Sequence, residues 1–189
     1  MTAAPKVAAD VDLARRAAKG DRAAFNALVR LNQDALYRFI RRYIGDAEEA
    51  YDILQDSFVA AWQAIGRLDP ERPVIVWLRR IALNKCRDWG RRRAVRKFFY
   101  RAGDIETANV ANAADEGGAE EEAVARLDRA IAQLPTQLKE PLLLTAFEGM
   151  SHDEAAAALG VTSKAIETRV YRARKTLATI LNAEGSDDD

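Results

Sequence analysis

The stretch that decides the fold is residues 149–177, GMSHDEAAAALGVTSKAIETRVYRARKTL. Ser151 can cap a helix, and Glu154, three residues later, completes the pattern of a capping box. Gly160 supplies the left-handed residue that ends such a helix, and the Thr-Ser pair at 162–163 can cap a second one. The pattern predicts two helices joined by a tight turn.

The second of these helices carries different side chains on its two faces. Its apolar residues recur at i, i+4, i+7 and i+11 and predict one narrow buried stripe: Ile166, Val170, Ala173 and Leu177. The other face is basic and polar, as is typical of a helix-turn-helix, whose second helix enters the DNA major groove. A plain helical hairpin with a solvated basic face is the simpler alternative. The candidate DNA contacts are Lys164, Ala165, Thr168, Arg169, Arg172 and Lys175.

The bulk composition favours a helical chain. Ala, Leu and Arg dominate the 189 residues over runs of β-branched residues. A single cysteine excludes an internal disulfide and is consistent with a reducing compartment. No apolar run approaches the roughly 20 residues that cross a bilayer, and the N-terminus lacks the core of a signal peptide. The expectation is a cytoplasmic, all-α protein.

The formal net charge of zero hides an uneven distribution. Residues 1–101 hold 21 Lys and Arg against 12 Asp and Glu, and residues 102–125 hold seven acids and no base. Two basic blocks separated by an acidic, small-residue segment suggest two modules that meet a polyanion. We therefore expect small helical domains at 10–100 and 123–181, joined by a flexible acidic linker at 101–122, with residues 1–9 unstructured.

A helix expected at 47–65 combines a heavy apolar stripe with a purely acidic outer face. The residues assigned to the stripe are Tyr51, Leu54, Phe58, Ala61, Trp62 and Ile65. The acids suit a helix N-terminus and a solvated face, but they also suit a docking surface for a basic protein partner. Charge alone leaves both interpretations open. The residues of the acidic face and its flank are Glu48, Glu49, Asp52, Gln55, Asp56 and Gln63.

The next segment is the most basic of the chain. Pro70 and Pro73 predict a loop over residues 66–76, and a helix is expected at 76–93. From Trp77 to Arg101 there are ten basic residues and one acid, interleaved with aromatic side chains. This combination serves both phosphate binding and base stacking. The alternative is a basic helix that binds only the acidic linker of the same chain.

The sequence offers little for catalysis. Cys86 and His152 are the only residues of their types and fall in different modules, so neither a metal site nor a Cys–His pair is supported. Glycine-rich phosphate loops and nucleophile elbows are missing too. Three carboxylates at i, i+4 spacing, within 48–56, lack the further ligands that complete a cation shell. We expect no enzyme, no metal and no cofactor.

Two motif blocks in this order resemble a known family. DAEEAYDILQDSFVAAW and WLRRIALNKCRDWGRRR, followed by an acidic linker and the helix-turn-helix, are similar to bacterial extracytoplasmic-function (ECF) sigma factors of the sigma-70 family. The resemblance covers roughly residues 15–181. It implies a two-domain helical initiation factor whose N-terminal domain binds the β′ clamp helices of RNA polymerase and melts the −10 element. The C-terminal domain would bind the −35 element and the β flap.

The resemblance also assigns roles to residues. Core-polymerase binding falls on Glu48, Glu49, Asp52, Gln55, Asp56 and Phe58. Contacts to the −10 element fall on the loop and the basic helix, namely Arg67, Asp69, Arg72, Trp77, Arg80, Asn84, Lys85, Arg87 and Arg91; Arg79, Arg92 and Arg93 belong to the same basic set. Trp77 and Trp89 look mainly structural.

The chain departs from the family pattern in its recognition helix. Glu167 stands where a lysine is common, and Lys164-Ala165 replace a Gly-Thr pair, so base preferences do not carry over. The family implies an anti-sigma partner and a stress or envelope regulon. Two other functions stay open at this point: a sigma-like protein that sequesters an anti-sigma factor without binding DNA, and a plain helix-turn-helix repressor.

Overall fold

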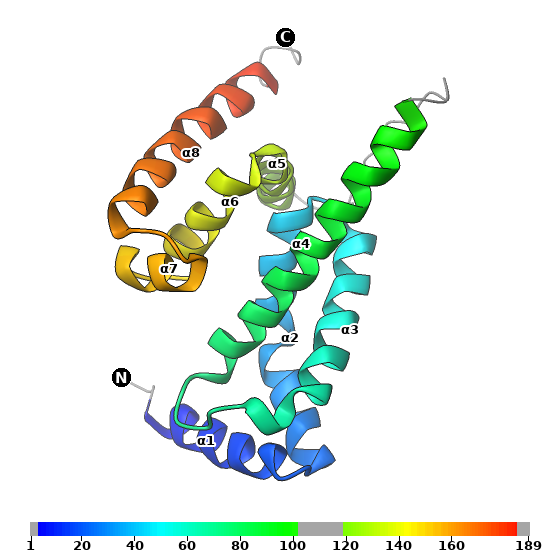
Figure 1. Ribbon diagram of the computed structural model, residues 1–189, viewed down its shortest axis with the longest axis vertical. Coiled ribbons are helices and arrows are strands. Elements are labelled where there is room, and N and C mark those ends of the chain that lie inside the picture. The colour runs from blue at the N-terminus through cyan, green and yellow to red at the C-terminus, as the bar shows by residue number, and fades with distance from the viewer. Residues whose placement is uncertain (1–3, 102–118, 185–189) are drawn as a thin grey trace.

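The computed structural model describes residues 4–101 and 119–184, and within these ranges the chain is helical with no strand (Figure 1). This confirms the all-α prediction. The elements in chain order are α1 (Ala4–Ala18), α2 (Arg22–Ile44), α3 (Ala47–Gln63), the 3-10 turn η1 (Ile65–Arg67), α4 (Val74–Arg101), α5 (Ala119–Gln133), α6 (Thr136–Leu142), the π-helical turn η2 (Leu143–Phe147), α7 (His152–Leu159) and α8 (Ser163–Glu184).

Helices α2, α3 and α4 pack side by side, and α1 lies across one end of them (Figure 1). We call α1–α4 the N-terminal helical group. Its centre is built from large side chains that periodicity along α2 and α4 places on one face, and burial of such side chains stabilises the group. The most completely buried of them are Leu28, Leu36, Phe39, Ile40 and Leu78.

Short polar residues begin two of these helices. Asp21 accepts a hydrogen bond from Ala24 N at 3.0 Å, and Asp46 accepts one from Glu49 N at 2.9 Å. Each satisfies an N–H group that the first turn of a helix leaves without a partner. Gly45 ends α2 with φ of 84°, a left-handed conformation that glycine adopts without strain.

Helices α5–α8 form the C-terminal helical group, in which α8 packs against α5, α6 and α7. Ser151 caps α7 through a complete capping box with Glu154, and Gly160 ends that helix at φ 68°. Of the two candidate caps for α8, the Thr162 hydroxyl accepts the hydrogen bond, from Ala165 N at 3.2 Å. The predicted stripe is buried at Ile166, Val170 and Ala173 and half-buried at Leu177. The helix-turn-helix prediction is confirmed in each of these details.

Removing the α7 cap is expected to destabilise the chain measurably. The Ser151→Ala variant loses the side-chain acceptor for Glu154 N, and its free energy of unfolding should fall by about 1 kcal/mol. Ser151→Asp keeps an acceptor and should unfold like the parent. Chemical denaturation of the three proteins measures this, and an unchanged midpoint for Ser151→Ala would contradict the role of the cap.

Four expectations about the elements need correction. Helix α1 begins at Ala4, so most of the segment expected to be unstructured is helical. Helix α4 begins directly after Pro73 and continues to Arg101, and α8 continues to Glu184. Neither helix meets a proline or glycine at its predicted end. Gly90 lies within α4 without ending it. On α3, Tyr51 is exposed, and the centre of its ring lies 4.5 Å from the centre of the Tyr37 ring. Ala50, Ile53 and Ser57 of α3 are buried instead.

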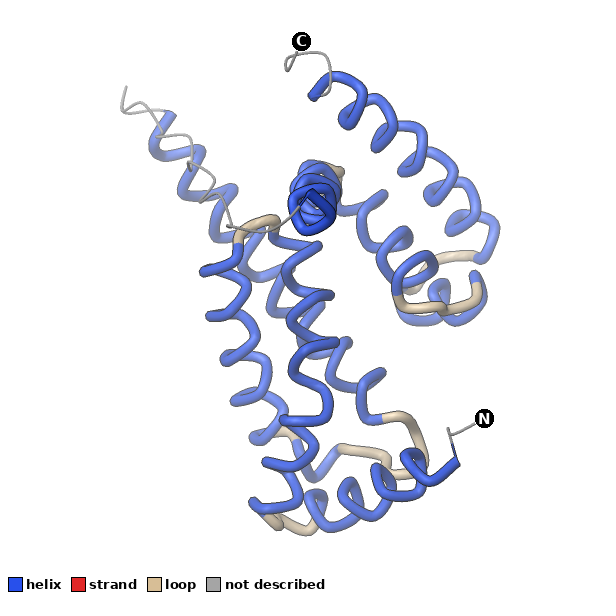
Figure 2. Tube along the Cα trace, turned by 180° about the vertical axis from the view of Figure 1, so that it is seen from behind, coloured by secondary structure: helices blue, strands red, loops and turns tan. Residues whose placement is uncertain are grey.

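The two helical groups are in contact. Helix α5 packs against α2, and η2 also meets α2 (Figures 1 and 2). The approach at Gly45 is so close that an added Cβ would lie 2.5 Å from the Cβ of Ala132. The two modules expected from charge therefore share an interface. Most of the linker expected at 101–122 lies outside the described residues.

Candidate functional site

The acidic face of α3 is open to solvent. Glu48, Asp52, Gln55 and Asp56 are exposed, whereas Phe58 is half-buried against the core beneath them. No basic residue of α3 itself interrupts this acidic face. Five of the six residues predicted for core-polymerase binding therefore share one side of α3 or its edge, and Phe58 supports that side from within.

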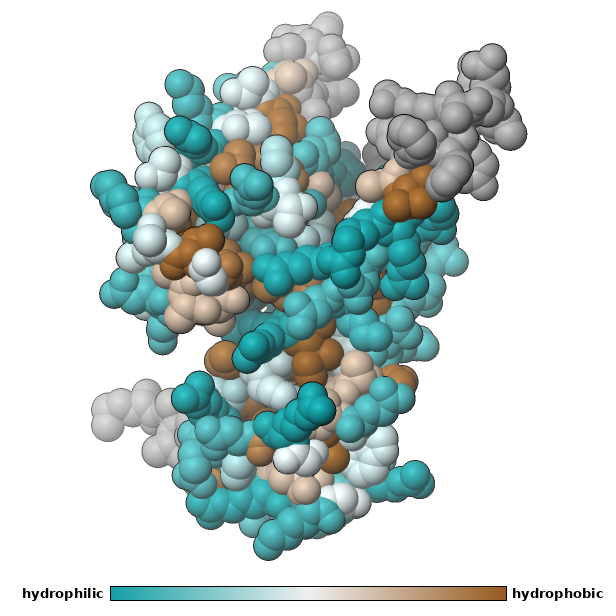
Figure 3. Space-filling model, viewed as in Figure 1, coloured by the Kyte–Doolittle hydropathy of each residue, from teal (hydrophilic) through white to brown (hydrophobic). Residues whose placement is uncertain are grey.

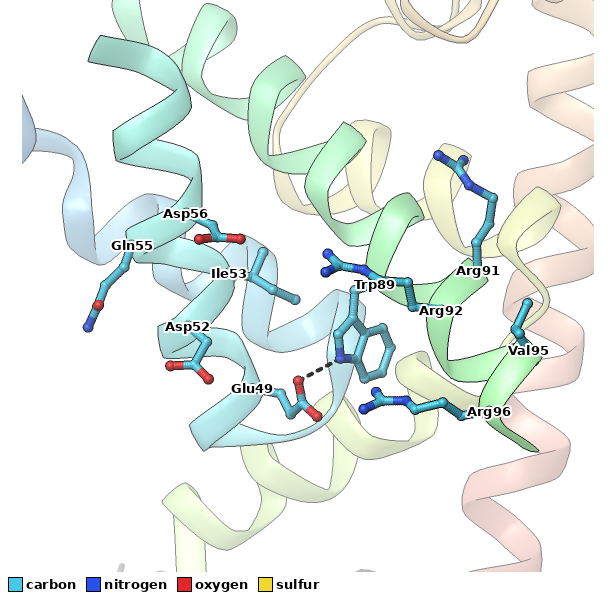
Figure 4. Close-up of a pocket in the computed structure, with 10 residues that line it drawn as sticks. All are labelled: Glu49, Asp52, Ile53, Gln55, Asp56, Trp89, Arg91, Arg92, Val95 and Arg96. Carbon is cyan, nitrogen blue, oxygen red and sulfur yellow. Dashed lines mark hydrogen bonds between the residues drawn. The ribbon is translucent and has the colours of Figure 1, made fainter. Parts of the chain in front are cut away.

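A groove runs between this face and the C-terminal half of α4 (Figure 4). Trp89 of α4 and Ile53 of α3 lie at its floor, and the indole Nε1 donates a hydrogen bond to Glu49 Oε2 at 2.7 Å. The guanidinium of Arg93 lies over the same indole at 5.0 Å. Trp89 thus joins the two helices, which fits the structural role expected of it. The groove carries acids on its α3 wall and arginines on its α4 wall: Asp52, Asp56, Arg91, Arg92 and Arg96.

The loop before α4 presents charged side chains held by local contacts. Asp69 accepts a hydrogen bond from Glu71 N at 3.1 Å and pairs with Arg72 at 3.3 Å. Glu71 pairs in turn with Arg15 of α1 at 2.6 Å, which ties the loop to the first helix. Arg67 and Arg72 are exposed, and Trp77 is half-buried at the start of α4. The predicted −10 residues of the loop are therefore grouped together.

The exposed side of α4 continues the basic surface, and in Figure 3 a hydrophilic band runs along this helix. Arg80 and Asn84 are exposed, Lys85 is half-buried, and the exposed Arg91 pairs with Asp88 one turn back. A contiguous row of basic groups on one helix suits binding to successive phosphates. The aromatic side chains at 98–100 lie outside the part of the chain whose side chains are described.

Two arginines of α4 have carboxylate partners in the C-terminal helical group. Arg87 donates from Nε at 2.7 Å and from Nη2 at 2.5 Å to the two carboxylate oxygens of Glu140. Arg79 pairs with Glu148, whose side chain is 4% exposed. The structure thus places Arg87 in a contact within the chain rather than among the exposed −10 residues. These two arginines therefore bind acids of the same chain, as in the alternative given for the basic helix. The acids lie in α6 and just after η2, however, and not in the linker.

A buried polar cluster surrounds Glu140. The Tyr43 hydroxyl donates to Glu140 Oε1 at 3.1 Å, and the Lys139 ammonium donates to the carbonyls of Tyr43 and Ala132 at 3.0 and 2.6 Å. Burial lowers the pKa of Lys139 to about 8 and raises the pKa of the Cys86 thiol beside it. Cys86 is fully buried, as expected of a packing residue.

This cluster predicts a stability that rises with pH over a narrow window. Between pH 8 and the ordinary lysine pKa of 10.5 the unfolded chain binds more protons at Lys139 than the folded one, so unfolding becomes harder as the pH rises. Above the ordinary thiol pKa of 9.0 the raised pKa of Cys86 acts in the opposite direction. The free energy of unfolding should rise by about 1 kcal/mol from pH 8 to 9 and then level off.

Chemical denaturation at half-unit pH steps measures this effect. Lys139→Met removes the titrating group and should flatten the rise, whereas Lys164→Met, at an exposed lysine of α8, should leave it unchanged. The same rise in Lys139→Met as in the parent would contradict the assignment.

The basic face of α8 is exposed at most of its predicted contacts. Lys164, Thr168, Arg172 and Lys175 are exposed, and Ala165 and Arg169 are half-buried. Lys164 is paired with Glu167 at 2.8 Å, and this pair lowers the pKa of the Glu167 carboxyl. The residue that departs from the family pattern therefore neutralises one of the predicted DNA contacts.

Sequence reasoning missed the residues that join the two groups. They are Arg42, Asp128, Lys139, Glu140 and Glu148. The sequence offered one signal, because Lys139 and Glu140 interrupt the otherwise apolar run from Leu138 to Leu144. In the structure both are almost fully buried. Charged residues are rarely buried unless they are paired, so their position in an apolar segment indicated a partner elsewhere in the chain.

No cluster of three or more His, Cys, Asp or Glu side chains in the described ranges is arranged to hold a metal ion. Among the same described residues, no helix is both long enough and apolar enough to pass through a bilayer.

Comparisons with known proteins agree with this organisation. Family models match residues 28–96 as "Sigma-70 region 2" and residues 125–177 as "Sigma-70, region 4". The RNA polymerase sigma factor CnrH of Cupriavidus metallidurans is 44% identical over 185 residues, which cover 93% of this chain and 96% of CnrH. The ECF RNA polymerase sigma factor SigM of Mycobacterium tuberculosis is 31% identical, over 91% of this chain and 84% of SigM.

Two solved structures share the fold. The structure of CnrH in complex with the cytosolic domain of CnrY matches with a TM-score of 0.65 and 38% identity, over 93% of this chain and 98% of that one. The sigma factor RpoE in complex with the anti-sigma factor NepR, from Bartonella quintana, matches with a TM-score of 0.66 and 25% identity, over 84% and 96% of the two chains. The chain belongs to the ECF sigma factors of the sigma-70 family, so it is a transcription initiation factor.

Proposed function

We propose that the acidic face of α3 binds the β′ clamp helices of core RNA polymerase. The observation that supports this most directly is the exposure of Asp52 and Asp56 on a helix without a basic residue. Complementary charge favours fast and selective encounter with a basic partner. Trp89 of α4 donates a hydrogen bond to Glu49, and arginines of α4 line the groove beside the same face. Polymerase and the melted strand would then bind next to each other.

The loop at 66–73 and the exposed side of α4 would bind the −10 element. A short charged loop can hold a base flipped out of the duplex, while Arg80, Lys85 and Arg91 contact the strand backbone. Trp77, half-buried at the start of α4, would support that strand. These assignments extend the proposal over residues 10–100 as the −10 domain.

Helix α8 would enter the major groove at the −35 element, with residues 123–181 as the second domain. Arg172 and Lys175 are exposed on the face opposite the buried stripe. Two basic side chains supply a small share of the binding free energy on their own. We therefore expect this domain to act as one half of a grip in which polymerase, through its β flap, sets the distance to the other half.

Control by an anti-sigma factor follows by analogy with the solved relatives, one of which was crystallised in complex with an anti-sigma factor. Such a partner would cover the α3 and α4 surfaces of this chain. On this proposal the protein acts in the cytoplasm on a stress or envelope regulon, performs no catalysis and needs no cofactor. A sigma-like decoy for an anti-sigma factor is the weaker candidate, because a decoy has no use for the phosphate-binding surface of α4.

The experiment that tests the proposal is run-off transcription with the purified chain and core polymerase on a genomic promoter library. We expect promoter-specific transcripts that depend on both proposed domains of the chain, residues 10–100 and 123–181. A complex with an anti-sigma factor, but no complex with core polymerase and no transcript, would favour the decoy. DNA binding without polymerase dependence would indicate a repressor.

A further inference from the structure

Helix α4 leaves the packed part of the N-terminal helical group directly after Trp89. Trp89 is half-buried at the floor of the groove beside α3, whereas residues 91–96 are all exposed. In Figure 1 this end of α4 extends beyond the neighbouring ends of α2 and α3. We call residues 91–96 the basic arm, because four of its six residues are arginine and none is acidic.

Gly90 stands at the joint between the packed part of α4 and the basic arm. Glycine is less favourable than alanine in the interior of a helix, because its backbone loses more freedom when it becomes helical. An added Cβ at Gly90 would meet no atom of the described residues within 4 Å, so no close neighbour requires glycine there. The helix is therefore intrinsically weak at this joint, and side-chain contacts around the joint decide how firmly the arm is held.

Trp89 makes contacts on both sides of the joint. Its indole Nε1 donates a hydrogen bond to Glu49 Oε2 at 2.7 Å, which holds the ring against the first turn of α3 (Figure 4). A hydrogen bond to a carboxylate is stronger than one between two neutral groups. Beyond Gly90, the Arg93 guanidinium lies 5.0 Å from the centre of the same ring, within the range of cation–π attraction. Glu49, Trp89 and Arg93 thus form a chain of contacts from α3 to the arm.

An arm with a fixed direction suits phosphate binding better than a mobile one. Arginines on a segment that is already ordered lose less conformational freedom on binding than arginines on a segment that must first be ordered. Contacts between basic side chains and phosphates supply much of the free energy of DNA binding. A chain of contacts that orders the arm can therefore raise the affinity for DNA without itself touching DNA.

We propose that Glu49 and Trp89 are positioning residues, which set the direction of the basic arm so that its arginines meet the phosphates of promoter DNA. This inference rests on the proposed binding of DNA by α4. It gives Glu49 a role different from the polymerase contact that the family resemblance implies, because its carboxylate already accepts a hydrogen bond from within the chain. Glu49 and Trp89 act only through the arm.

Pulsed electron paramagnetic resonance on the free chain measures the direction of the arm. Nitroxide labels would be placed at Gln33→Cys in α2 and Val95→Cys in the arm, both exposed, in a Cys86→Ala background. The distance distribution should be narrow in the parent and wider in Glu49→Ala. Glu49→Gln keeps an acceptor for the indole N–H and should stay narrow. Glu48→Ala removes the same charge from the neighbouring exposed position and is the matched control.

Trp89→Phe tests the same hydrogen bond from the other side. It keeps an aromatic ring at the floor of the groove but removes the donor, so the distribution should widen as in Glu49→Ala. Combining the two substitutions should add no further widening, because both remove one interaction. Equal widths in the parent, Glu49→Ala and Trp89→Phe would overturn the proposal. Far-UV circular dichroism checks that each variant keeps its helices.

Gly90→Ala tests the joint itself. Added to Glu49→Ala, it should narrow the distribution again, because alanine favours the helix and its methyl group meets no described atom. A distribution that stays wide in this double variant would overturn the assignment of the joint to Gly90.

Formation of open promoter complexes supplies the functional measurement. At saturating core polymerase, the affinity for promoter DNA should fall about fivefold in Glu49→Ala and in Trp89→Phe, as expected for the loss of one hydrogen bond. Glu49→Gln should recover most of this loss. Equal losses in Glu49→Gln and Glu49→Ala would point to the charge of Glu49 and overturn the proposal. The distance distribution is measured without polymerase or DNA, so a chain that holds its arm but forms no promoter complex would contradict the proposed function and leave the positioning of the arm standing.

Discussion

Replacing Asp52 or Asp56 with arginine is expected to abolish binding to core RNA polymerase and with it all promoter-specific transcription. Both side chains are exposed on the acidic face of α3, so the substitutions should change the free energy of unfolding by no more than about 0.5 kcal/mol. A like-charge contact with a basic partner costs several kcal/mol, and about 3 kcal/mol corresponds to a loss of affinity of roughly a hundredfold. Surface plasmon resonance with immobilised core polymerase measures the loss.

Asp34→Arg is the matched control for these variants. Asp34 is exposed on α2, outside the proposed surface, and its replacement makes the same change in net charge. The affinity of the Asp34→Arg variant for polymerase should stay within about threefold of the parent affinity. Affinities of Asp52→Arg and Asp56→Arg that match this control would show that the acidic face of α3 is not the polymerase-binding surface.

Local signals in the sequence predicted the helices and the turn of the helix-turn-helix. The cap at Ser151 and the stop at Gly160 both hold in the structure. Such signals depend on hydrogen bonds within four residues, so they act in any surrounding structure. The apolar stripe of α8 was equally predictable, because one face of that helix packs on a single layer of neighbours.

The stripe on α3 was harder to predict because this helix has neighbours on two sides. Packing against both α2 and α4 buries Ile53 and Ser57, and it leaves Tyr51 on the outside. Aromatic character suggested burial, but the ring of Tyr51 is instead placed against Tyr37 at the surface. An aromatic residue such as Tyr51 can therefore lie next in sequence to a buried residue and still be outside the buried face of its helix.

The contact between the two helical groups was beyond the reach of charge patterning. Summed charges described a basic N-terminal segment and an acidic linker, and they favoured the linker as the internal partner of α4. The partners are Glu140 and Glu148, whose segment is otherwise apolar and close to neutral. Arg87 and Glu140 are 53 positions apart in the chain, and Arg79 and Glu148 are 69 positions apart. Whether such distant residues pair depends on how the helices pack, and periodicity along one helix carries no information about that packing.

Substituting Arg172 by alanine is expected to weaken use of the −35 element by roughly five- to a hundredfold. Arg172 is exposed on α8, and a specific side-chain contact to a base in the major groove is worth about 1–3 kcal/mol. Lys164→Ala should have a smaller effect, because Lys164 is already paired with Glu167 and part of its charge is neutralised before DNA arrives. Run-off transcription with promoters that carry and lack the −35 element measures the effect.

Arg174→Ala provides the matched control, since Arg174 is also exposed on α8 but lies about 160° around the helix from Arg172. It removes the same charge from the same helix and should lower transcription no more than about twofold. Equal losses in the two variants would point to a general effect of charge rather than a contact in the groove. Glu167→Ala should act in the opposite direction, because it releases Lys164 for a phosphate and steepens the dependence of binding on salt. An unchanged salt dependence in that variant would place Lys164 outside the DNA interface.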